Sequence, residues 1–122
     1  MKHLIKHLTT IALFALLLAV APRLADAHAM LDRAEPRVGN TVASPPHAVT
    51  LWFTQKLETA FSTVSVTGPN GERVDAGKPQ ISGNQMSVAL KASGKGVYRV
   101  TWRVLSVDSH TTEGNFTFTV GP

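Results

Sequence analysis

The sequence contains no cysteine, so neither disulfide bonds nor thiolate metal sites can stabilise the folded chain. An apolar core must therefore hold the chain together, and any bound metal is expected to use nitrogen or oxygen ligands. The 122 residues leave room for only one small domain once a removable leader at residues 1–27 is set aside. The sequence thus predicts a single domain over residues 28–122.

Net charge is also low in this domain, because its nine Lys and Arg residues are interleaved with seven Asp and Glu residues. A protein that binds nucleic acid is expected to gather its basic residues on one face. The interleaved charges therefore predict no nucleic-acid partner.

The leader lacks an apolar run long enough to span a membrane. Its longest run, residues 11–21, has eleven residues, whereas a spanning helix needs about 20. Lys2 and Lys6 precede this run, and Ala25-Asp26-Ala27 places small residues where signal peptidase cleaves. The pattern predicts a signal peptide that is cleaved after Ala27, with export and no stable membrane insertion after processing.

The body of the chain alternates apolar and polar residues with the period of two that is typical of strands buried on one face. The segments with this pattern are Val49 to Phe53, Phe61 to Val66, Met86 to Leu90, Tyr98 to Val104 and Phe116 to Val120. No helix is predicted after residue 27. About seven short strands separated by Gly- and Pro-rich turns predict an all-β fold, a Greek-key antiparallel β-sandwich of immunoglobulin-like or cupredoxin-like type.

Core packing is the default expectation for the aromatic residues in these strand patterns. They are Trp52, Phe53, Phe61, Tyr98, Trp102, Phe116 and Phe118. Met30 and Met86, the two methionines of the domain, are likewise expected to be core residues.

Cleavage after Ala27 would make His28 the first residue and change its chemistry, because a free α-amino group then lies beside the imidazole. The amine and Nδ1 can close a six-membered chelate ring around a metal ion. An α-amine, with a reference pKa of about 7.7–8.0, loses its proton far more readily than a lysine amine. His28 is therefore a candidate metal ligand. The alternative is that a histidine happens to follow the cleavage site and has no role in metal binding.

Asp108 and His110 supply a second half of the candidate site. They stand two residues apart, so in an extended segment both side chains leave from the same side. Asp-x-His alone is a weak signal, because a polar loop between strands carries the same residues. Combined with His28, the pair completes a set of one amine, two imidazoles and one carboxylate, which suits Cu(II) in a square or tetragonal arrangement. Zinc accepts similar ligands, and Cu(I), which prefers sulfur, is poorly served.

Other polar residues are not assigned to the site. His47 has no partner at metal-ligand spacing and is expected to be a solvated loop residue. The stretch from Ser106 to His110 has the composition of a hydrolase site, but no nucleophile elbow or oxyanion loop accompanies it. Glu113 follows closely enough to accept a hydrogen bond from the metal ligands.

Three stretches carry a resemblance to a known family. They are His28-Ala29-Met30-Leu31 at the processed terminus, Thr50-Leu51-Trp52-Phe53-Thr54 in an early strand, and residues 102–114, WRVLSVDSHTTEG, near the end. On these stretches the chain resembles the CopC family of periplasmic copper-resistance proteins, which are small Greek-key β-sandwiches. The resemblance spans nearly all of residues 28–122.

The resemblance implies one Cu(II) ion per chain, held by the amine and imidazole of His28, the Asp108 carboxylate and the His110 imidazole. It also implies traffic with other periplasmic or inner-membrane copper-resistance proteins. Some members hold Cu(I) in a methionine-rich loop, but the corresponding stretch here, Thr67 to Gln80, has no methionine. Some members also place a glutamate near the Cu(II) site where this chain has Gln55.

The sequence therefore predicts an exported, non-enzymatic Cu(II)-binding protein that serves copper sequestration, resistance or transfer in the periplasm. Two alternative hypotheses stay open. One is a copper monooxygenase, because lytic polysaccharide oxidases with β-sandwich cores also bind copper through an amine and imidazole, although Asp108 would fill a position that oxygen activation needs open. The other is a metal-free interaction module.

Overall fold

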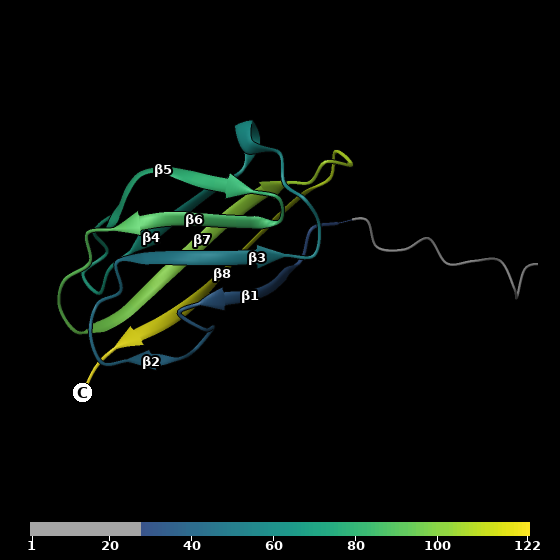
Figure 1. The fold of residues 1–122 in the computed structure, drawn as a ribbon. Helices are drawn as coiled ribbons and strands as arrows, with labels where there is room; N and C mark the ends of the chain where they lie inside the picture. The colour runs from purple at the N-terminus through teal and green to yellow at the C-terminus, as the bar shows by residue number, and fades with distance from the viewer. Residues whose placement is uncertain (1–27) are drawn as a thin grey trace, which may run out of the picture.

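The structure is a computed structural model that describes residues 28–122, so the predicted signal peptide and its cleavage after Ala27 lie outside the described residues. Residues 28–122 form eight β-strands and one short 3-10 helix (Figure 1). None of the helical structure in these residues is long and apolar enough to cross a membrane. The prediction of an all-β fold is confirmed.

The strands are arranged in two sheets of four that pack face to face (Figure 1). The elements are β1 (Leu31–Glu35), β2 (Thr41–Val42), β3 (Ala48–Phe53), η1 (Thr59–Phe61), β4 (Thr63–Thr67), β5 (Asp75–Ser82), β6 (Gln85–Leu90), β7 (Gly96–Leu105) and β8 (Thr111–Val120). One sheet has the order β1-β3-β6-β5 and the other has the order β2-β8-β7-β4. Neighbouring strands run antiparallel except for β2, whose two residues pair parallel with the end of β8. The sandwich is confirmed, with eight strands in place of about seven.

Alternating apolar side chains from both sheets fill the space between them. On β7, Tyr98, Val100, Trp102 and Val104 are buried while the residues between them are exposed. The pattern follows from the pleat, which sends successive side chains to opposite faces. The Phe53 ring on β3 meets the Trp102 ring on β7 edge to face, with centroids 5.1 Å apart, so aromatic packing joins the two sheets.

Two aromatic residues depart from the prediction of core packing. Phe61 lies in η1 with 69% of its surface exposed, and the strand begins only at Thr63. Trp52 is only partly buried, and the guanidinium carbon of Arg33 lies 3.7 Å from the centroid of its ring. Leu51 and Phe53 occupy the core face of β3, so Trp52 between them must point outward, where the cation–π contact covers it.

Gly114 on β8 is required by the packing of Trp102. The two residues are partners across β7 and β8, and a Cβ at Gly114 would lie 2.6 Å from Cζ2 of the indole. The indole is also held by its contact with Phe53. Even a methyl group at position 114 therefore requires the ring or the strand to shift.

We expect Gly114→Ala to lower the free energy of unfolding by about 1–3 kcal/mol, because overpacking a close-packed core forces such shifts. Chemical denaturation measures this change. Gly121→Ala is the matched control, since a Cβ there would make only ordinary contacts, with the methyl groups of Thr119 and Thr41 at 3.7 Å. Unchanged stability of Gly114→Ala would show that the indole moves aside freely.

Candidate metal centre

The predicted ligands His28, Asp108 and His110 lie at one end of the sandwich. His28 precedes β1, and the other two residues belong to the turn that joins β7 to β8 (Figure 1). The ring centroids of His28 and His110 are 4.7 Å apart, with the rings tilted by 42°. The fold thus brings together two histidines from opposite ends of the domain.

Hydrogen bonds to both sheets hold the segment before β1 in place. The Ala29 side chain is fully buried, and its carbonyl oxygen accepts a hydrogen bond of 2.6 Å from Oγ1 of Thr112 on β8. The backbone N–H of Met30 donates to Oγ1 of Thr54, which follows β3, and the N–H of Thr54 donates to the Met30 carbonyl oxygen, both at 2.9 Å. These bonds fix the backbone on the C-terminal side of His28.

A tight turn presents Asp108 and His110. The N–H of Ser106 donates to the His110 carbonyl oxygen at 3.0 Å, and the N–H of Ser109 donates to the Ser106 carbonyl oxygen at 2.9 Å. Ser109 has a φ of 71°, a left-handed conformation that few non-glycine residues adopt. The prediction of an extended segment is therefore wrong here, because the backbone reverses direction between the two candidate ligands.

The turn nevertheless places the two side chains in contact. Oδ1 of Asp108 lies 3.4 Å from Nδ1 of His110 and accepts a hydrogen bond from Oγ of the fully buried Ser106. The Ser106 hydrogen bond is the main cause that lowers the pKa of Asp108. Burial acts in the opposite direction, and the hydrogen bonds and charge of His110 add to the lowering. The carboxylate consequently stays ionised at a lower pH than an ordinary aspartate. While the contact persists, Nε2 is the nitrogen of His110 that can bind a metal ion.

The candidate ligands are exposed to solvent, but their side chains are not arranged around a common metal position. The Asp108 and His110 side chains are 35% and 50% exposed. Across residues 28–122, no three His, Cys, Asp or Glu side chains are placed to hold a metal ion. In the 122-residue chain the nitrogen of His28 is part of the peptide bond to Ala27, so the predicted amine ligand exists only after cleavage. A site that uses all four predicted groups would therefore need both cleavage and a rotation of the exposed side chains.

The remaining histidine and the two methionines of the domain differ in their exposure to solvent. His47 is exposed in the loop before β3, as predicted, at the far end of that strand from Thr54. Met86 is fully buried, as predicted, but Met30 is 50% exposed, so the prediction of a core position is wrong for Met30. The reason is that Ala29 takes the inward position, and its neighbours in an extended segment point outward.

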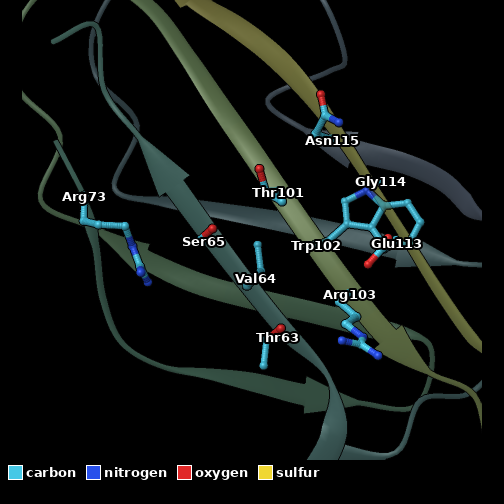
Figure 2. A pocket seen from close by; sticks show the side chains of 10 residues that line it. All are labelled: Thr63, Val64, Ser65, Arg73, Thr101, Trp102, Arg103, Glu113, Gly114 and Asn115. Atoms are coloured by element: carbon cyan, nitrogen blue, oxygen red, sulfur yellow. The ribbon is translucent and has the colours of Figure 1, made fainter. Parts of the chain in front are cut away.

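Glu113, for which a hydrogen bond to the metal ligands was predicted, and Gln55, for which no contact was predicted, line two different pockets. Glu113 lines a groove of about 670 Å³ on β4, β7 and β8, together with Arg103 and Asn115 (Figure 2). None of the hydrogen bonds described within residues 28–122 joins Glu113 to Asp108 or His110, so that prediction is wrong. Gln55 lines a separate pocket of about 450 Å³ with Val107, the residue before Asp108.

Thr112→Val is expected to weaken Cu(II) binding several-fold, because it removes the hydroxyl that holds the Ala29 carbonyl oxygen beside the turn. The free energy of unfolding should fall by about 1 kcal/mol, the ordinary net contribution of one hydrogen bond. Competition titration and chemical denaturation measure the two effects. Thr117→Val, the same change further along β8, serves as the control. Full Cu(II) affinity in Thr112→Val would show that this bond does not position His28.

Comparison with known proteins gives one family. The family model of the CopC domain matches residues 31–121. Protein YobA of Escherichia coli (strain K12) is 40% identical over 98 residues, which cover 77% of this chain and 79% of YobA. Copper resistance protein C of Xanthomonas campestris pv. juglandis is 32% identical over 121 residues, which cover 92% of this chain and 93% of that protein.

A solved structure shows the same similarity in three dimensions. The crystal structure of CopC from Methylosinus trichosporium OB3b matches this chain with a TM-score of 0.72 at 32% sequence identity. The match covers 78% of this chain and 95% of that chain. Sequence and fold comparisons therefore agree over the domain that runs from β1 to β8.

Proposed function

Because the chain belongs to the CopC family and is a copper-handling protein, we propose that it binds a single Cu(II) ion through His28, Asp108 and His110. The observation that carries the proposal is the 4.7 Å separation of the His28 and His110 rings at one end of the sandwich. Copper is the cargo of this site. The ion would bind after removal of residues 1–27 in the periplasm.

The donor set fits this cargo. After cleavage, His28 would offer its α-amine and Nδ1, His110 would offer Nε2, and Asp108 would offer a carboxylate oxygen. Three nitrogens and one oxygen suit the tetragonal preference of Cu(II), which also binds nitrogen ligands more tightly than the other divalent ions of the first transition row. The Ser106 hydrogen bond supports the role of Asp108, because it keeps the carboxylate ionised.

The scaffold supports storage or transfer of copper. The candidate ligands are partly exposed, so an ion can enter and leave without opening the core. The segment before β1 and the turn after β7 are held by hydrogen bonds that need no metal. The domain is therefore expected to fold without copper and to exchange the ion with other copper-resistance proteins.

Titration of the protein that begins at His28 with Cu(II), followed by visible absorption and electron paramagnetic resonance, tests the proposal. We expect saturation at one equivalent with a tetragonal, nitrogen-rich signal. His110→Ala should lose this signal, whereas His47→Ala, which removes an exposed histidine far from the turn, should keep it. The absence of a copper signal at one equivalent would favour a metal-free module, and turnover of reductant and peroxide with a polysaccharide would favour a monooxygenase.

A further inference from the structure

Met30 is an exposed methionine beside the proposed copper site. Half of its surface is exposed, whereas Met86, the other methionine of the domain, is fully buried in the core. Packing therefore explains Met86 but leaves the flexible thioether of Met30 open to solvent. Within residues 28–122, Met30 is accordingly the methionine that is exposed to solvent.

The backbone places Met30 on the same side of the chain as His28. Met30 pairs with Thr54 through two hydrogen bonds, which extend the antiparallel pairing of Leu31 with Phe53. Ala29, between His28 and Met30, is fully buried. Alternate residues of an extended segment share a face, and their Cα atoms lie about 7 Å apart. Met30 and His28 therefore both lie outside the core, two residues apart along the chain, with the buried Ala29 between them.

The groups near this end of the sandwich suit different oxidation states of copper. A hard carboxylate and an amine favour Cu(II), whereas a soft thioether favours Cu(I), and imidazole serves both ions. The His28 and His110 rings, 4.7 Å apart, are thus common to both sets of ligands. A thioether added to these two rings would complete a set of ligands for the reduced ion.

We infer that Met30 supplies a sulfur ligand for Cu(I) at this end of the sandwich, together with the imidazoles of His28 and His110. The inference rests on the proposed function for the location of copper, but it needs neither the α-amine nor Asp108. One end of the molecule would then hold either oxidation state by exchanging the amine and carboxylate for the thioether. No redox step is required, because either ion can be supplied as such.

The inference is tested by measuring the affinity of the protein for Cu(I) and for Cu(II) separately. Cu(I) affinity is measured without oxygen by competition with a colorimetric Cu(I) chelator, and Cu(II) affinity by competition in air. Met30→Leu should lower Cu(I) affinity by about tenfold or more, while Cu(II) affinity stays within about twofold, because only Cu(I) prefers the thioether. Met86→Leu, a matched change in the core, should leave both affinities unchanged. X-ray absorption of the Cu(I) form should show a copper–sulfur distance that Met30→Leu lacks.

Acetylation of the α-amine separates this inference from the proposed function. The acetylated protein should lose Cu(II) affinity and retain Cu(I) affinity. If the protein with a free amine binds Cu(II) but Met30→Leu leaves Cu(I) affinity unchanged, the sulfur ligand is refuted and the Cu(II) site stands. If His110→Ala changes neither affinity, the copper site itself is misplaced and both proposals are overturned.

Discussion

Acetylation of the α-amine of His28 is expected to weaken Cu(II) binding by about a hundredfold or more, as severely as His110→Ala. The amine and Nδ1 belong to one residue, so binding of the first nitrogen holds the second near the ion. Joining two binding groups in this way raises the overall affinity by about 10²–10⁴. Acetylation removes the amine from this pair and adds no new ligand nitrogen.

The α-amine can be modified selectively because it loses its proton about two pH units below a lysine amine. Acetylation at mildly acidic pH therefore leaves the lysines charged, and mass spectrometry after proteolysis verifies the position. His47→Ala with a free α-amine is the control for loss of an unrelated imidazole. Equal Cu(II) affinity before and after acetylation would remove His28 from the chelate that we propose.

Cu(II) affinity is expected to fall steeply as the pH drops below about 6, since protons compete with the ion for the amine and both imidazoles. The limiting slope is about tenfold per pH unit for each nitrogen that must lose a proton. Asp108 does not contribute in this range. The hydrogen bond from Ser106 lowers the pKa of Asp108. Its carboxylate therefore stays ionised over this pH range and is protonated only at a lower pH than an ordinary aspartate.

Competition titrations between pH 5 and pH 8 measure this slope, and calorimetry in buffers of different ionisation enthalpy measures the protons released on binding. The acetylated protein is the control, because it lacks one titrating ligand and should show a shallower slope. An affinity that stays constant from neutral to mildly acidic pH would contradict a site built on these three nitrogens.

Strands that alternate strictly were predictable from sequence, including the edge strand β4, whereas the edge strands β1 and β5 were not. β7 pairs on both sides and buries one face, so its residues alternate strictly from Tyr98 to Val104. β5 is an edge strand with Pro79 and a register shift between Ala76 and Gln80, and β1 carries a shift between Leu31 and Arg33. Bulges of this kind break the period of two on which the prediction depended.

The proposed ligands His28, Asp108 and His110 were chosen from ligand chemistry and from the family resemblance, and their assignment stays a prediction. How the fold positions them could not be predicted. The hydrogen bond from Thr112 to Ala29 joins distant parts of the chain, and no local pattern indicates it. Met30 is exposed because its neighbour Ala29 takes the buried position. In the sequence, the small apolar Ala29 between His28 and Met30 was the feature that could have indicated this.

A crystal structure of the processed protein, beginning at His28 and soaked with a cupric salt, tests the central claim most directly. We expect one ion bound by the α-amine and imidazole of His28, the carboxylate of Asp108 and the imidazole of His110. An ion bound elsewhere on the domain, or no bound ion at full soaking concentration, would contradict the proposed site.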